Sequence, residues 1–149
     1  MMKLKSERDV RIWTKNKAGS SVFWIEAARG GTFGFTDTVI VQQGRIAFLE
    51  LKFGRWLAAN GQARFSLRKG QKPALRRLQA NGACAGVLVG LPARDGVGPL
   101  LAVLRPGPVA WGGQINIYGL KHPEGLLVEA DDPWAWEDVM NFVMAQGGR

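Results

Sequence analysis

GFTDTVIVQQGRIAFLELK, residues 34–52, decides the fold because it reads as two β-strands joined by a tight turn. Apolar and β-branched residues dominate both halves, and the Gln43-Gly44 pair between them is typical of a two-residue hairpin turn. Away from the turn, where Arg45 follows Gly44, the charged residues Asp37, Glu50 and Lys52 interrupt this pattern. A hairpin has no structural need for charges among its apolar neighbours, so these three side chains are candidates for chemistry.

The turn fixes which side chains face each other across the hairpin. With two residues in the turn, Gln42 faces Arg45, and the same register sets Asp37 opposite Glu50 with their Cβ atoms about 4.5–5.5 Å apart. Lys52 follows on the same face of its strand. Two facing carboxylates repel, and Lys52 together with a divalent cation would compensate them. A three-residue loop would instead set Asp37 opposite Leu49 and separate the cluster.

The rest of the chain predicts an α/β domain, in which helices flank a mixed central β-sheet. Helices are predicted over about 5–17, 69–82 and 131–145, the last starting with a capping Asp and a Pro. Strands are predicted over 21–27, 36–41, 45–52, 84–91 and 100–104, with a short edge strand over 115–120. A glycine-rich loop is predicted over 29–35 and an irregular basic connection over 53–66. The order is therefore αβββαβ, followed by further strand and helix.

Composition limits the chemistry that this sequence supports. The 149 residues predict a single domain over 1–149. A single cysteine excludes an internal disulfide and a thiolate zinc cluster. A single histidine argues against histidine-based metal sites and against Ser-His or Cys-His catalysis. Any metal is then expected to be held by oxygen, which favours magnesium, manganese or calcium. Neither a membrane span nor a signal-peptide core is visible, which predicts a cytoplasmic protein with no membrane partner.

The charge is strongly uneven along the chain. Residues 1–94 hold 17 Lys and Arg against 5 Asp and Glu, a net of +12, whereas residues 95–149 hold 3 against 7, a net of −4. No acidic residue lies between Glu50 and Asp95. A run of one sign is often only a solvated face, but its place beside candidate carboxylates favours a polyanionic partner such as nucleic acid.

The helix predicted over 69–82 adds one polar group to the cluster. Gln71, Leu75 and Leu78 follow a spacing of four and then three residues, so Gln71 shares the face that packs on the sheet. Its amide is expected to point inward and to orient a phosphate or a water. Lys72 and Arg76 lie off that face and are expected to point outward.

Asp37, the Glu50-Leu51-Lys52 triplet and the glutamine-bearing helix occur in an order that resembles the PD-(D/E)XK nuclease superfamily. The branches it most resembles are the Holliday-junction-resolvase-like and VRR-Nuc groups, small forms of which are widespread in phage. The resemblance covers residues 5–91, a restriction-endonuclease-like core, and leaves 92–149 as a C-terminal elaboration. Thr36 stands where the family has a proline, which shapes the backbone and does no chemistry.

The resemblance implies a Mg²⁺- or Mn²⁺-dependent endonuclease that hydrolyses DNA phosphodiester bonds, with branched or junction DNA as a candidate substrate. Asp37 and Glu50 would be metal ligands together with the main-chain carbonyl of Leu51. Lys52 would position the attacking water and stabilise the pentavalent phosphate, and Gln71 would support the site. Glu7 is similar in placement to a first-helix glutamate that several members use in the site, and Glu26 is the alternative for that role.

DNA in duplex, branched or single-stranded form is the expected partner, in the cytosol of a bacterium or of a phage-infected host. The residues expected to contact it are Arg55, Arg64, Arg68, Lys69, Lys72, Arg76, Gly31 and Gly34. Trp56 lies in the basic connection and is a further contact or a core residue. A homodimer is expected by analogy, with Trp134 and Trp136 of the last helix at its seam.

Two other functions fit the same sequence. One is a non-catalytic DNA-binding accessory protein that retains the nuclease fold, against which the intact set of Asp37, Glu50 and Lys52 speaks. The other is a structural or inhibitory protein whose basic surface has no nucleic-acid role. Salt-dependent DNA binding would exclude the second, and metal-dependent cleavage would exclude both.

Overall fold

The structure is a computed structural model that describes residues 3–24, 38–57, 61–68, 70–106, 113–121 and 124–145. The helices are α1 (Glu7–Ala18), α2 (Gln71–Ala80) and α3 (Ala135–Met144), with the short 3₁₀ helices η1 (Gly19–Ser21) and η3 (Ile117–Gly119). The strands are β1 (Val22–Trp24), β2 (Thr38–Gln42), β3 (Arg45–Phe53), β4 (Arg55–Trp56), β5 (Gln62–Arg64), β6 (Cys84–Leu91), β7 (Leu100–Leu104), β8 (Gln114–Asn116) and β9 (Gly125–Glu129).

The hairpin of β2 and β3 has the predicted register. Gln42 pairs with Arg45, and the pairing continues without a break to Thr38 and Leu49. Gln43 and Gly44 form the turn with φ angles of 51° and 72°. Two consecutive residues with positive φ match the right-handed twist of the strands, and glycine adopts this conformation without strain. The two-residue turn is therefore confirmed, and the three-residue alternative is wrong.

A six-stranded mixed sheet forms the centre of the fold, in the order β1-β2-β3-β6-β7-β9. β3 and β6 run parallel, and every other neighbouring pair in this sheet is antiparallel. All eight residues of β6 are buried, as the continuous apolar run over 84–91 predicts. The mixed sheet and the flanking helices confirm the expected α/β class.

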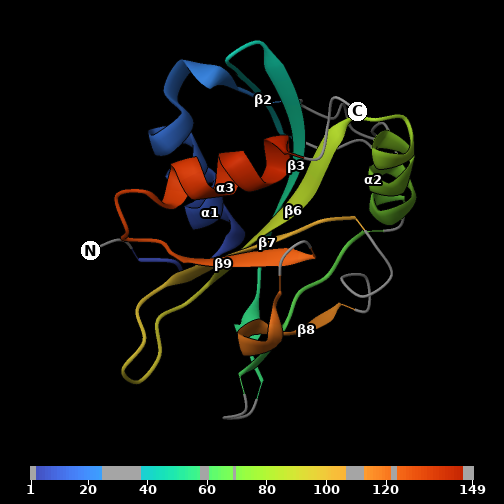
Figure 1. Ribbon diagram of the computed structural model, residues 1–149. Helices are drawn as coiled ribbons and strands as arrows, with labels where there is room; N and C mark the ends of the chain where they lie inside the picture. The colour runs from blue at the N-terminus through green and yellow to red at the C-terminus, as the bar shows by residue number, and fades with distance from the viewer. Residues whose placement is uncertain are drawn as a thin grey trace.

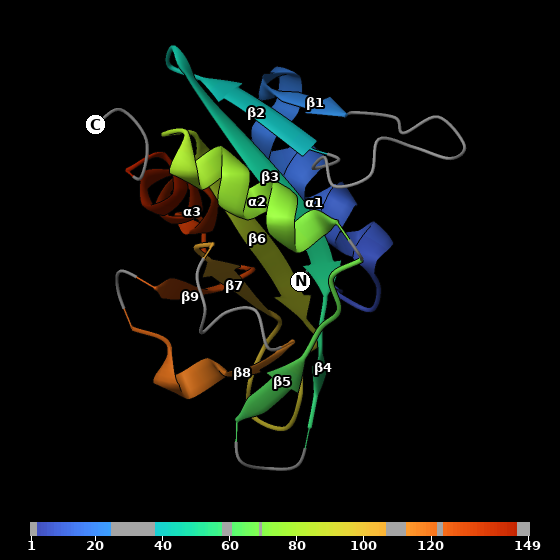
Figure 2. The same ribbon diagram turned by 90° about the vertical axis from the view of Figure 1, so that its right-hand side faces the viewer.

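Helices cover both faces of this sheet. Figure 2 shows α2 in front of the sheet and α1 and α3 behind it. Behind the sheet, Trp13 of α1 and Val139 of α3 pack on Leu49 and Leu51 of β3. In front, Leu75 of α2 packs with alternate residues of β6 and β7. Successive residues of β3 therefore face different layers, so Glu50 and Lys52 lie on the face of α2.

A second sheet makes the predicted irregular connection over 53–66 partly wrong. β4, β5 and β8 form a small antiparallel sheet beyond the end of β3, where Figure 2 labels all three strands and Figure 1 shows β8 below the central sheet. Ala63 and Ile115 turn one face of this small sheet toward the core beside α2. The strand predicted over 115–120 is β8 followed by η3, and β8 is indeed an edge strand.

Local signals account for where the helices begin. Ser6 caps α1, its hydroxyl accepting a hydrogen bond from the Asp9 N–H, so Glu7 is the first helical residue. The predicted start of the last helix with a capping aspartate is wrong. α3 begins at Ala135 after Trp134, while Asp132 accepts a hydrogen bond from the Trp134 N–H within the preceding turn. Within the described residues, no helix combines the length and apolar character needed to cross a membrane.

Candidate active site

Glu50 and Lys52 are buried charged residues in the middle layer of the protein. Their side chains point toward α2 from the last part of β3, where only 2% of Glu50 and 6% of Lys52 is exposed. Burying a charged group without compensation costs several kcal/mol. Their burial is therefore informative, because the fold tolerates both charges only with partners at close range.

Gln71 is the partner that α2 contributes. Its Nε2 donates a hydrogen bond of 2.5 Å to Glu50 Oε1, and its Oε1 accepts one of 2.6 Å from the main-chain N–H of Arg68. The Arg68 N–H can only donate, so it fixes the orientation of the amide and directs Nε2 at the carboxylate. The inward position predicted for Gln71 by helical spacing is what the structure shows, and Leu75 follows it on the buried face.

Lys52 lies between two carboxylates from different elements. Its Nζ is 3.8 Å from Glu50 Oε1 and 4.0 Å from Glu7 Oε1, at the start of α1. Both separations exceed hydrogen-bonding length, so the carboxylates compensate the ammonium charge without occupying its donors. Residues 7, 50 and 71 thus meet around Lys52 from three elements that are far apart in the sequence.

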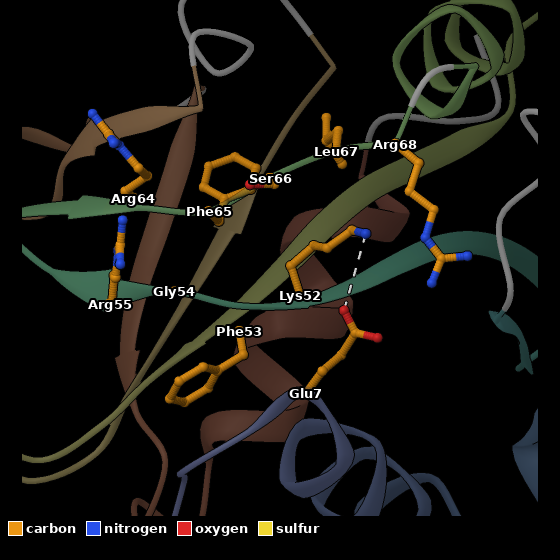
Figure 3. Close-up of a pocket in the computed structure, with 10 residues that line it drawn as sticks. All are labelled: Glu7, Lys52, Phe53, Gly54, Arg55, Arg64, Phe65, Ser66, Leu67 and Arg68. Carbon is orange, nitrogen blue, oxygen red and sulfur yellow. Dashed lines mark ion pairs between the residues drawn. The ribbon is translucent and has the colours of Figure 1, made fainter.

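A cavity of about 480 Å³ opens beside this cluster. Figure 3 shows Lys52 and Glu7 at its centre, joined by their ion pair, with Arg68 toward one end and Arg55 and Arg64 toward the other. Among the described residues that line it, Glu7 is the one acidic residue. The cavity therefore offers a concave, predominantly cationic surface to an anionic ligand.

Arg55 and Arg64 face each other directly across β4 and β5. Both side chains are exposed, and both line the cavity. Like charges that are directly opposite in an antiparallel pair destabilise a sheet, here a sheet of only three short strands. A polyanion in the cavity would turn this repulsion into a favourable contact.

A second hollow of about 630 Å³ continues from the first. Residues 64–68 line both hollows and so form the ridge between them. Lys72 and Gly70, at the start of α2, line the second hollow together with Gln114 of β8. The two hollows provide a cationic path that passes Lys52 and reaches the N-terminus of α2.

The predicted site residues divide into three groups. Glu7, Glu50, Lys52 and Gln71 meet in one cluster, and Arg55, Arg64, Arg68 and Lys72 line the adjoining hollows. Arg76 is exposed on α2 and is not among the residues lining either hollow. Asp37, Glu26, Lys69, Gly31 and Gly34 lie outside the described residues.

The donors present are those that a hard divalent cation prefers. Glu50 and Glu7 supply carboxylate oxygens on either side of Lys52, and the main chain of Leu51 lies between Glu50 and Lys52 while its side chain is in the opposite core. Such oxygen donors fit Mg²⁺ or Mn²⁺. Within the described ranges, no three His, Cys, Asp or Glu side chains gather closely enough to hold a metal. A third carboxylate would have to come from outside the described residues, to which Asp37 and Glu26 belong.

The ridge of residues 64–68 and the hydrogen bond from the Arg68 main chain to Gln71 were not predicted from the sequence. Nothing in 64–68 signals that the Arg68 N–H orients Gln71, because the side chain at a position does not specify its main-chain contacts. The facing of Arg55 and Arg64 was missed as well. A two-residue turn at Asn60-Gly61 would set Arg55 opposite Ser66, whereas the observed register pairs it with Arg64.

Replacing Gln71 by methionine is expected to destabilise the protein by about 1–3 kcal/mol, since it leaves Glu50 and the Arg68 N–H without their shared amide. Urea unfolding measures this change. Gln79→Met on the same helix is the matched control, because Gln79 is exposed and its replacement should change the free energy of unfolding by under about 0.5 kcal/mol. Equal effects of the two substitutions would contradict a supporting role for Gln71.

Comparison of the sequence with known protein families finds no family that matches it, and a search of curated proteins finds no match either. The function of the chain is therefore inferred from its own residues and their geometry.

Proposed function

We propose that the protein is a metal-dependent DNA endonuclease that hydrolyses phosphodiester bonds at the Lys52 cluster. The observation that carries this proposal is a buried lysine, compensated by two carboxylates, at the centre of an arginine-lined cavity. A buried ion pair alone is weak evidence for function. The position of this ion pair within a cationic cavity is what favours a reaction at a phosphate group.

Glu50 and Asp37 would hold Mg²⁺ or Mn²⁺ in this proposal, with the main-chain carbonyl of Leu51 between Glu50 and Lys52. Asp37 is assigned from the sequence, as the residue that precedes Thr38, whose partner across the hairpin is Leu49. When bound, the cation would lower the pKa of a bound water and stabilise negative charge on the phosphate. Gln71 holds the Glu50 carboxylate in place and so keeps its orientation constant.

Lys52 would act directly on the reacting phosphate. Hydrolysis forms a bond between a water oxygen and phosphorus and breaks one ester P–O bond, while negative charge builds up on the phosphoryl oxygens. A preorganised ammonium within a protected cavity stabilises that charge more effectively than water does. Among the described residues, neither Glu50 nor Glu7 is within hydrogen-bonding distance of Nζ, so neither carboxylate would compete with a phosphate for the donors of Lys52.

Arg55, Arg64 and Arg68 would hold the DNA backbone on both sides of the scissile bond. Guanidinium groups pair with phosphates through two parallel hydrogen bonds, which suits them to positioning a strand. Lys72 extends this path along the second hollow. The cross-strand repulsion between Arg55 and Arg64 is relieved when phosphate enters.

Arg64→Ala is expected to weaken DNA binding at every sequence, because it removes a phosphate contact and not a base contact. The slope of log affinity against log salt concentration should become less negative by about 0.9, as one fewer counterion is released. Fluorescence anisotropy with labelled DNA across a salt series measures this slope. Lys15→Ala is the control, since Lys15 is an exposed residue of α1 outside the cavity, and an equal change for both variants would contradict the assignment.

The proposal is tested by cleavage of labelled four-way junction, flap, single-stranded and duplex DNA with Mg²⁺, Mn²⁺ or EDTA. Cutting that requires the metal is the expected result, and the best substrate among the four identifies the preferred DNA form. Salt-dependent binding without cutting under either metal would overturn the proposal and favour the accessory protein. Absence of binding would exclude both nucleic-acid functions.

A further inference from the structure

The exposed side chain of Tyr118, next to the small sheet, is contacted by residues from three other segments of the chain. The ring of Tyr118 in η3 lies 6.3 Å from that of Trp56 in β4, with 19° between their planes. The Arg94 guanidinium lies 3.7 Å from the centroid of the Trp56 ring, and its Nη2 donates a hydrogen bond of 3.3 Å to the Tyr118 hydroxyl. Trp56 is itself fixed by a 2.8 Å hydrogen bond from Nε1 to the Pro92 carbonyl.

Gly61 completes the support of the Tyr118 ring. A Cβ at position 61 would collide with that ring, and the φ angle of 76° there is one that glycine adopts without strain. Despite these contacts, 57% of Tyr118 remains exposed. An aromatic ring that is fixed in orientation and open to solvent is preorganised to stack on another flat ring.

We infer that Tyr118 stacks on an unpaired base of the DNA substrate, so that the protein acts on DNA with a single-stranded segment near the cleaved bond. This inference rests on the proposed function, because it assumes that DNA is bound and cleaved at Lys52. Trp56 follows Lys52 by four positions along an extended segment, so their Cα atoms lie at most about 13 Å apart.

The charge around the ring favours a base over an apolar protein surface. Arg94 contacts both aromatic rings, so a cation accompanies the stacking surface. Trp134 offers a contrast, because it is 64% exposed but adjoins Asp132 and Glu137 near the start of α3. A DNA strand would be repelled there, which makes Trp134 the matched control for an exposed aromatic residue.

The test uses single-stranded DNA oligonucleotides in which 2-aminopurine, a fluorescent base, occupies successive positions. Binding in EDTA, which prevents cleavage, is followed by the quenching of this base when it stacks. Wild type and Tyr118→Phe should quench one or two adjacent positions. Tyr118→Ala should lose the quenching and bind about tenfold more weakly, and Trp134→Ala should match wild type.

Unchanged quenching and affinity in Tyr118→Ala would overturn the inference. The nuclease proposal would stand in that case, because metal-dependent cleavage of duplex DNA is measured separately on the same proteins. Loss of binding in Tyr118→Phe as well as in Tyr118→Ala would also overturn it, since the phenyl ring retains the stacking surface. Wild-type protein that stacks the base but cuts no DNA in either metal would instead remove the proposed function.

Discussion

Lys52→Met is expected to reduce DNA cleavage by about 10²–10³-fold at saturating DNA while leaving DNA affinity within about twofold of wild type. Methionine retains most of the volume of the lysine stem and removes only the ammonium. The proposed contacts of Arg55, Arg64 and Arg68 with the DNA backbone are left in place, so binding should persist. The loss should therefore fall on the chemical step, which single-turnover cleavage measures directly.

Lys17→Met is the matched control for this substitution. Lys17 lies in the last turn of α1 and is exposed, so its replacement removes one positive charge without touching the cavity. Its cleavage rate should stay close to that of wild type. Cleavage by Lys52→Met at the wild-type rate would exclude Lys52 from the mechanism, whatever its effect on binding.

Glu50→Gln is expected to reduce cleavage by at least about 10²-fold, because an amide is a poor ligand for Mg²⁺ and leaves the cluster without its central carboxylate. The chain should still fold, since the new side-chain oxygen can accept the hydrogen bond from Gln71. Calorimetric titration with Mn²⁺ should show weaker binding. The measurements are cleavage, Mn²⁺ affinity and the urea midpoint on the same preparation.

Glu129→Gln controls for the change of charge. Glu129 is exposed on β9, at the opposite edge of the central sheet from β1, and should retain activity and Mn²⁺ affinity. The double variant with Lys52→Met should be no slower than the slower single variant, because residues that act on one transition state are strongly non-additive. Full cleavage by Glu50→Gln, or independent effects in the double variant, would contradict a shared site.

Much of this cluster could be predicted from the sequence because its geometry is set by short-range rules. A two-residue turn determines the hairpin register, and strand alternation then puts Glu50 and Lys52 on one face. Helical spacing brings Gln71 to the buried side of α2. These rules act within a strand or a helix, so they hold without knowledge of the rest of the fold.

The small sheet could not be predicted as readily. β4 and β5 are two and three residues long, too short for alternation to be visible. The second partner of β5, β8, lies about fifty residues further along the chain. Their pairing depends on tertiary packing of Ala63 and Ile115 against the core. The ridge of residues 64–68, the facing arginines and the support of Tyr118 all follow from this sheet, which is why the sequence pattern did not reveal them.

The C-terminal helix illustrates a similar limit. Trp134 and Trp136 are both tryptophans at the start of the last helix, but their surroundings differ. Trp136 packs edge-on against Trp13 at 6.0 Å and donates a hydrogen bond to Gln42, whereas Trp134 is exposed. Trp136 is partly buried by these contacts. Of the two residues predicted for a dimer interface, Trp134 is therefore the exposed one. The proposed homodimer stays a prediction.

The paired carboxylates are the central claim, and Asp37→Asn tests them most directly. The substitution removes one charge with little change of size at the position before Thr38. Single-turnover cleavage of the preferred DNA in Mg²⁺ is the measurement, with circular dichroism to show that the variant is folded. A folded variant that binds DNA and has lost cleavage by at least about 10²-fold is the predicted result. A folded variant that cuts at the wild-type rate would contradict the pairing of Asp37 with Glu50 and, with it, the proposed site.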